Sequence, residues 1–215
     1  MHSDPIFIIG NPRSGTTLLR LILTNHALVA IPPECGFIYE LRGFNAEKFP
    51  QCLDKYLAEL KTVDKIGNWS LDFTALAKFL KEMNPTSYSG LVETVMQFYL
   101  RSKFPGKRVW GDKNNYYLSH IPYLNELFPN ARFIHIYRDG RDVLCSYKDM
   151  QQTSGKHSPK VPSNAYNAAL QWRINLNKIN EALAQLDSDR THYVKYEELV
   201  KTPLTVVGDM CRFLG

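Results

Sequence analysis

The chain has 215 residues but only four cysteines, and no two of these are spaced like a metal-binding pair. A structural zinc site, which needs closely spaced cysteine and histidine ligands, is therefore not expected. Long apolar runs are also missing, so we expect no transmembrane span, and the first residues lack the basic start of a signal peptide. These absences indicate a soluble, cytoplasmic protein, and nothing in the cysteine pattern requires an oxidising compartment.

The overall charge and composition are those of an ordinary globular protein. The net charge is +5, and hydrophobic residues make up 44% of the chain. This mild positive charge favours an anionic ligand, but the sequence lacks the dense blocks of lysine and arginine that bind nucleic acid. We therefore expect no nucleic-acid partner.

Short apolar segments alternate with helical patterns along the whole chain. Strands are expected at 6–9, 28–31, 108–111, 132–137 and 191–195. Helices are expected near 15–26, 47–61, 72–83, 88–103, 117–128, 140–150, 164–186 and 203–214. This alternation predicts a P-loop-like, three-layer α/β fold with a central parallel sheet flanked by helices. We expect one domain over 1–215, with a helical excursion at about 45–105.

Residues 10–17, GNPRSGTT, follow the first predicted strand and precede a helix. The two glycines have the spacing of a P-loop, but a threonine stands where the P-loop lysine would reach the terminal phosphates of ATP. The helix start still offers backbone N–H groups, three hydroxyl groups and a glycine that allows close approach. These come from Ser14, Gly15, Thr16 and Thr17. With Arg13 as the cation, the loop suits a single 5′-phosphate that carries a small group.

A second anion site is predicted in RFIHIYRDGRDVLCSY, residues 132–147. Arg138 directly follows a strand, and Ser146 lies about two turns into the next helix. Because ligands of parallel sheets bind at the carboxyl ends of strands, the two sites are expected at one edge, where Arg138 and Ser146 grip a phosphate. The alternative is a surface ion pair of Arg138 with Asp139 or Asp142.

Together, the two segments resemble the sulfotransferases that use 3′-phosphoadenosine 5′-phosphosulfate (PAPS). Residues 193–215, YVKYEELVKTPLTVVGDMCRFLG, also resemble a segment of that family, so the resemblance covers nearly the whole chain. It implies that residues 13–17 bind the 5′-phosphosulfate, that Arg13 contacts the bridging oxygen, and that Arg138 and Ser146 bind the 3′-phosphate. It further implies 3′,5′-ADP as product, transfer without a metal, and Tyr196 facing the adenine. Trp172 is either a further wall of this site or a core residue.

The sequence differs from the cytosolic members of the family mainly at the residue that removes the proton of the acceptor. They carry a histidine two residues after a lysine, whereas here Lys113 is followed at that position by Asn115. The chain is more similar to the tyrosylprotein and glycan type, which implies Glu34, in IPPECGF, as the base and Lys113 as a catalytic cation. Glu34 as a surface carboxylate, or as the N-cap of a helix at 36–43, is the alternative. Four histidines compete as bases: His26, His120, His135 and His157.

Other classes of function remain open. One is a nucleotide-dependent kinase with a degenerate loop, for which Asp112 and Asp139 are candidate Mg²⁺ ligands. Another is a non-catalytic nucleotide-binding module.

The expected acceptor is a hydroxyl or amine of a small molecule, glycan or peptide. Five aromatic residues either line an acceptor pocket or belong to the core: Phe37, Phe44, Trp69, Tyr116 and Tyr117. Family members usually have a later basic segment that closes over the 3′-phosphate. Either the chain is truncated before such a segment, or another group takes this role, for which the mobile loop expected at 151–164 is the nearest candidate.

Overall fold

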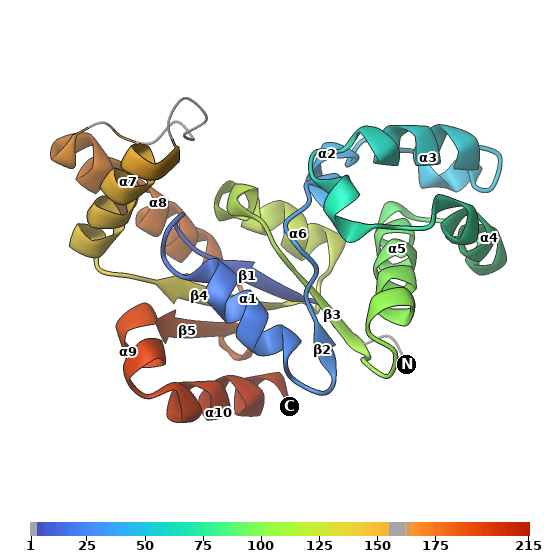
Figure 1. Ribbon diagram of the computed structural model, residues 1–215. Helices are drawn as coiled ribbons and strands as arrows, with labels where there is room; N and C mark the ends of the chain where they lie inside the picture. Colours follow the sequence, from blue (N-terminus) through green and yellow to red (C-terminus); the bar gives the residue numbers. More distant parts are fainter. Residues whose placement is uncertain (1–3, 155–161, 163) are drawn as a thin grey trace.

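The computed structural model describes residues 4–154, 162 and 164–215. At its centre lies a five-stranded sheet in the order β2-β3-β1-β4-β5, in which all neighbouring strands run parallel (Figure 1). The strands are β1 (Ile6–Ile9), β2 (Val29–Ala30), β3 (Val109–Lys113), β4 (Arg132–Tyr137) and β5 (Thr191–Lys195). The predicted α/β fold with a parallel sheet is therefore confirmed.

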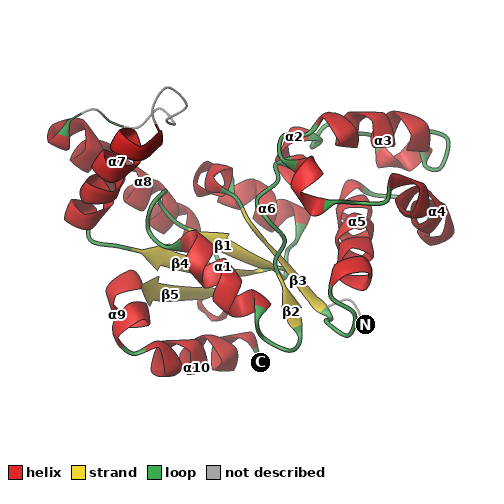
Figure 2. Cartoon of the chain, in the orientation of Figure 1, coloured by secondary structure: helices red, strands yellow, loops and turns green. Residues whose placement is uncertain are grey.

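Helices cover both faces of the sheet, which gives three layers (Figure 2). Pleating sends alternate strand residues to opposite faces, so Phe7 and Phe133 join one apolar cluster, while Ile8 and Ile134 join the other. The Phe7 side is covered by α5 (Tyr88–Lys103), α6 (Ile121–Leu127) and α8 (Ala165–Leu183). The Ile8 side is covered by α1 (Thr16–Thr24), α9 (Tyr196–Lys201) and α10 (Pro203–Leu214).

Between β2 and β3 the chain makes the helical excursion, which stands at the upper right of Figure 1. It follows the short helix α2 (Phe37–Glu40). Its elements before α5 are the 3₁₀ turn η1 (Ala46–Lys48), α3 (Leu53–Thr62), the 3₁₀ turn η2 (Ile66–Trp69) and α4 (Phe73–Met83). Its buried side chains, among them Tyr56 and Leu76, belong to the same cluster as Phe7 of the sheet. The excursion is thus packed against the sheet, and the assignment of the whole chain to one domain stays a prediction.

Several helix boundaries were predicted wrongly. The helix expected at 47–61 begins only at Leu53, and the one expected at 117–128 begins at Ile121, after the 3₁₀ turn η3 (Asn115–Ser119). The Asn114 side chain caps that turn by accepting from the Tyr116 N–H, which favours a tight turn before the helix. α7 (Gly140–Ser154) is longer than predicted, and α9 was missed because its six residues are too few to show a helical period.

None of the helices in the described part of the chain is long and apolar enough to span a membrane. Most of the expected mobile loop, including Lys156, His157 and Lys160, lies outside the described residues.

Candidate active site

A cavity of about 860 Å³ lies at the carboxyl edge of the sheet. Such a volume is within the usual range for pockets that hold small ligands. The predicted site residues that line it come from the first loop, the segment after β2, the end of β3, the turn after β4, α7 and α9. They are Arg13, Gly15, Thr16, Thr17, Glu34, Lys113, Arg138, Ser146 and Tyr196. The fold therefore brings together residues that are up to 183 positions apart, since Arg13 and Tyr196 line the same space (196 − 13).

The first loop forms an anion cradle at the start of α1. Leu19 donates the first helical hydrogen bond to the Gly15 carbonyl at 3.0 Å, so the preceding N–H groups of the first turn have no acceptor within the helix. Such N–H groups, with the helix dipole, attract a phosphate. Ser14 is the exception among the predicted cradle residues, because it is fully buried and does not line the cavity. The hydroxyls that do line it belong to Thr16 and Thr17.

Gly15 is needed for this arrangement on two counts. Its φ of 93° is a left-handed conformation that residues with a side chain rarely adopt. A Cβ at this position would also lie 2.5 Å from Cδ2 of Tyr196. The Tyr196 ring therefore packs directly on the glycine. Its predicted contact with adenine stays a prediction.

Arg138 directly follows the strand β4, and its guanidinium lies over the Tyr196 ring. Its guanidinium carbon is 4.3 Å from the ring centroid, and its Nη1 donates to the Arg13 carbonyl at 3.4 Å. The ion pair with Asp142 is loose, at 3.9 Å, and the buried Nε has no hydrogen-bond partner among the described residues. Asp139 instead pairs with Arg141 at 2.6 Å. Arg138 thus retains hydrogen-bonding capacity beside the cavity.

Ser146 contacts Arg13 and not Arg138 in this structure. The Nε of Arg13 donates to the Ser146 Oγ at 2.9 Å, which ties the first loop to α7. Both residues line the cavity together with Arg138. The predicted contact of Ser146 with a 3′-phosphate stays a prediction.

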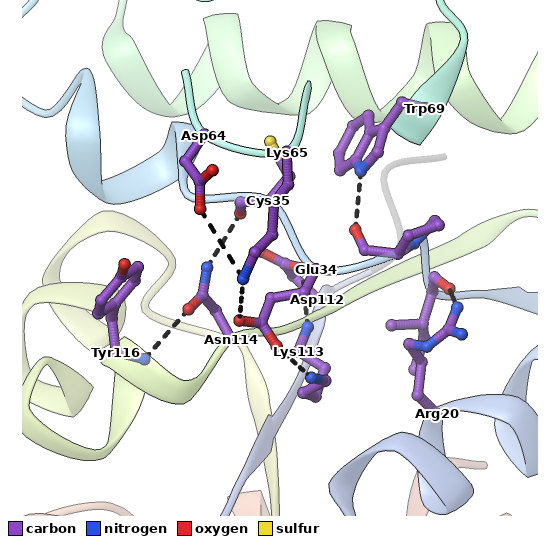
Figure 3. A network of polar contacts seen from close by, with 12 residues as sticks. Arg20, Glu34, Cys35, Asp64, Lys65, Trp69, Asp112, Lys113, Asn114 and Tyr116 are labelled. Carbon is purple, nitrogen blue, oxygen red and sulfur yellow. Dashed lines mark hydrogen bonds and ion pairs between the residues drawn. The ribbon is translucent and has the colours of Figure 1, made fainter. Parts of the chain in front are cut away.

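Glu34 and Lys113 form an ion pair at the cavity wall. Lys113 Nζ donates to Glu34 Oε2 at 2.5 Å. The Lys113 side chain is only 6% exposed and that of Glu34 is 18% exposed. Figure 3 shows a second lysine, Lys65, which approaches Glu34 from the other side and donates to Oε1 at 3.0 Å. Burial alone would raise the pKa of Glu34, but the two lysines outweigh it and lower the pKa below its ordinary value.

Lys65 is the site residue that the sequence did not reveal. It lies in the excursion, in a left-handed conformation with φ of 63°, just before η2. It belongs to no motif, and a lysine in a polar turn is normally solvated. Only the packing of the excursion against the segment after β2 brings it to Glu34.

The other residues considered from sequence lie away from the cavity. Trp172 packs against Gly140, where a Cβ would lie 3.0 Å from the indole, and it donates to the Arg138 carbonyl at 3.1 Å. His135 is a buried strand residue, and burial lowers its pKa to about 4. His26 follows α1 and accepts from the Leu28 N–H. His120 contacts the Tyr116 carbonyl at 2.7 Å. No histidine among the described residues lines the cavity, and His157 lies outside them.

Neither candidate magnesium ligand faces the cradle. Asp112 is fully buried and accepts from the Tyr117 hydroxyl and, at 2.7 Å, from the Lys113 N–H. Burial raises the pKa of Asp112 to about 7. Asp139 accepts twice from the Arg141 side chain. Among the residues that the structure describes, no group of three or more His, Cys, Asp or Glu side chains could hold a metal ion.

The fold and the cavity define a P-loop-like α/β protein with an anion cradle at the end of its first strand and a second cationic group at the end of the fourth. Residues 5–215 match the sulfotransferase family, and the chain belongs to it.

Relatives of this family support the assignment. A protein-tyrosine sulfotransferase of Drosophila melanogaster is 28% identical over 210 residues, which cover 97% of this chain and 37% of that protein. Protein-tyrosine sulfotransferase 2 of Gallus gallus is 26% identical over 98% of this chain and 50% of its own length. The chain thus spans half or less of these two relatives. The solved sulfotransferase domain from the curacin biosynthetic pathway is 28% identical, with a TM-score of 0.63 over 99% of this chain and 74% of that domain.

Proposed function

We propose that the protein transfers a sulfuryl group from PAPS to an acceptor hydroxyl or amine. The observation that carries the proposal is a single cavity in which the cradle of the first loop, Arg138 and the Glu34–Lys113 pair all take part. Membership of the sulfotransferase family supports the same reaction.

The residues present fit the donor. The start of α1 offers unpaired N–H groups for the 5′-phosphosulfate, and Arg138 keeps a buried Nε without a partner among the described residues. A guanidinium suits a second phosphate because it donates several charge-assisted hydrogen bonds. PAPS would supply the sulfuryl group and a good leaving group, 3′,5′-ADP. The cradle has no P-loop lysine, which agrees with a donor that has no γ-phosphate.

The side chains around the reacting centre have complementary tasks. Glu34 is ionised at neutral pH, since its pKa is lowered, and can accept the proton of the acceptor. Lys113 and Arg13 line the same cavity and supply positive charge where negative charge would develop on the leaving phosphate. The Glu34–Lys113 contact keeps base and cation next to each other before any substrate is bound.

A tyrosine-containing peptide is the first acceptor to test, because two of the relatives are protein-tyrosine sulfotransferases. Of the aromatic residues considered for an acceptor pocket, Phe37, Trp69 and Tyr117 are buried in the core. Tyr116 does not line the cavity, but it is 49% exposed and follows Asn115, which does; we propose it for an acceptor contact at the cavity rim.

The proposal is tested first by ligand binding and then by turnover. We expect 3′,5′-ADP to raise the melting temperature more than ATP with Mg²⁺ does, because the tighter ligand stabilises the fold more. With ³⁵S-labelled PAPS we then expect label on a tyrosine peptide or on a small phenol. Stronger stabilisation by ATP with Mg²⁺ would favour a kinase. Binding of 3′,5′-ADP without transfer to any of a broad set of acceptors would favour a non-catalytic module.

A further inference from the structure

A short segment of the excursion, residues 64–69, meets the segment that carries Glu34. The Trp69 indole N–H donates to the Pro33 carbonyl at 2.7 Å, and the Trp69 side chain is almost fully buried. The Asp64 N–H donates to the Glu40 carboxylate at 3.4 Å. Between these two anchors, Lys65 reaches the Glu34 carboxylate (Figure 3). The excursion therefore binds both the backbone next to Glu34 and the Glu34 side chain.

The two lysines on Glu34 differ in what else they can reach. Lys113 lines the cavity, is 6% exposed and binds Oε2 from the sheet. Lys65 does not line the cavity, is 44% exposed and binds Oε1 from the excursion. A carboxylate held at both oxygens by cations from two elements cannot rotate without losing one of them. If Lys113 turns toward a bound phosphate, Lys65 alone keeps the carboxylate in place.

We infer that Lys65 is a positioning residue that keeps the Glu34 carboxylate ionised and oriented while Lys113 contacts the phosphate of the bound donor. The inference rests on the proposed function, and it adds a role for the excursion that neither phosphate site requires. Lys65 does not contact the reacting atoms; it acts through Glu34.

Other charged and titratable groups near Glu34 must be considered in any test that varies pH. They come from the first loop, β3, the 64–69 segment and η3: Arg13, Asp112, Lys113, Asp64 and Tyr116. The two lysines are the groups that lower the pKa of Glu34. Asp112, whose pKa is about 7, titrates in the same molecule, so Glu34 has to be observed directly.

The test compares Lys65→Met with Lys78→Met, which removes the same charge from the same excursion. Lys78 is 82% exposed, and its ion pair with Glu82 spans 4.0 Å. In a ¹³C titration of the glutamate carboxyls, with Glu34 assigned through Glu34→Gln, Lys65→Met should raise the Glu34 pKa by about one unit. The kcat should fall about tenfold through misalignment, with the KM for PAPS within about twofold. Lys65→Arg should restore both values, and Lys78→Met should change neither.

Two outcomes would overturn the inference. One is a Glu34 titration in Lys65→Met that matches wild type; the other is a raised Glu34 pKa with a kcat equal to that of Lys78→Met. Lys65→Gln, which keeps a hydrogen-bond donor without the charge, provides the same comparison if the methionine variant folds poorly. Failure of the proposed function would look different: the wild type would transfer no label. In that case no role in transfer could stand, whatever the titration shows.

Discussion

Arg13 Nε donates to Ser146 Oγ over 2.9 Å, and this bond joins the first loop to α7 across 133 positions of the chain. Arg13 has a left-handed backbone with φ of 73°, and its guanidinium is held by a hydrogen bond to a residue outside the loop. The Ser146 hydroxyl accepts that bond. The two phosphate sites predicted from sequence are thus physically linked before a donor binds.

We expect Ser146→Ala to weaken 3′,5′-ADP binding about three- to tenfold, because a partly exposed hydrogen bond to a charged group is lost. The Arg13→Ala/Ser146→Ala double variant should lose less than the sum of the single variants, since the two residues act through one contact. Isothermal titration calorimetry provides the dissociation constants. Cys145→Ala, an exposed neighbour on α7, is the control and should bind like wild type. Strictly additive losses would mean that Ser146 and Arg13 act separately.

Arg138 should determine the preference for a 3′-phosphate. Its guanidinium lies between the Tyr196 ring and the Arg13 carbonyl, with Nε still unbonded among the described residues. Arg138→Ala should weaken 3′,5′-ADP binding about ten- to hundredfold and leave 5′-AMP binding nearly unchanged, because only the former has the second phosphate. The matched control is Arg141→Ala, whose side chain is 90% exposed and paired with Asp139. Equal losses for both nucleotides would contradict the assignment.

Glu34→Gln should retain donor binding and lose most of the turnover. A positioned base typically contributes about 10²–10⁴-fold, and glutamine keeps the size of the side chain without its basicity. Single-turnover transfer from PAPS, measured beside 3′,5′-ADP affinity, separates the two effects. Glu82→Gln, an exposed glutamate of the excursion, serves as control. A rate near that of wild type would mean that another group removes the proton.

A site residue could be predicted from sequence when the features that define it lie close to it along the chain. The first loop and Arg138 are adjacent in sequence to their own strands, so local apolar runs and glycine spacing were enough to place them at one edge of the sheet. Ser14 was assigned to the cradle by the same motif, yet its side chain is buried, because neighbouring loop residues point in different directions. The loop pattern fixes which residues are present but not which of them face the ligand.

Lys65 marks the limit of the sequence argument. It lies 31 positions from Glu34, and no period or motif links the two. Their contact depends on how the excursion packs, in which Trp69 is anchored to the Pro33 carbonyl. The missed helix α9 has a similar cause: it is short, and its first residue, Tyr196, is fixed by packing against Gly15 rather than by a helical pattern.

His135 should make the stability of the protein depend on acid pH. Its side chain is 1% exposed on β4, and neither ring nitrogen has a hydrogen-bond partner among the described residues. Burial lowers its pKa in the folded state to about 4, against an ordinary value of 6.5. The unfolded chain therefore takes up the proton first as the pH falls. The stability due to neutral His135 is complete above pH 6.5 and is lost as the pH falls toward 4.

His135→Phe removes this titration and keeps an aromatic ring beside Tyr193, whose ring centroid lies 5.7 Å away. Between pH 6.5 and 4 the free energy of unfolding of the wild type should fall more steeply than that of the variant, with a difference approaching about 1.4 kcal/mol per pH unit. Urea unfolding at several pH values measures it. Asp112, with its raised pKa, has the opposite dependence in both proteins and cancels in the difference. Parallel curves for wild type and His135→Phe would show that the folded protein protonates His135 as readily as the unfolded chain does.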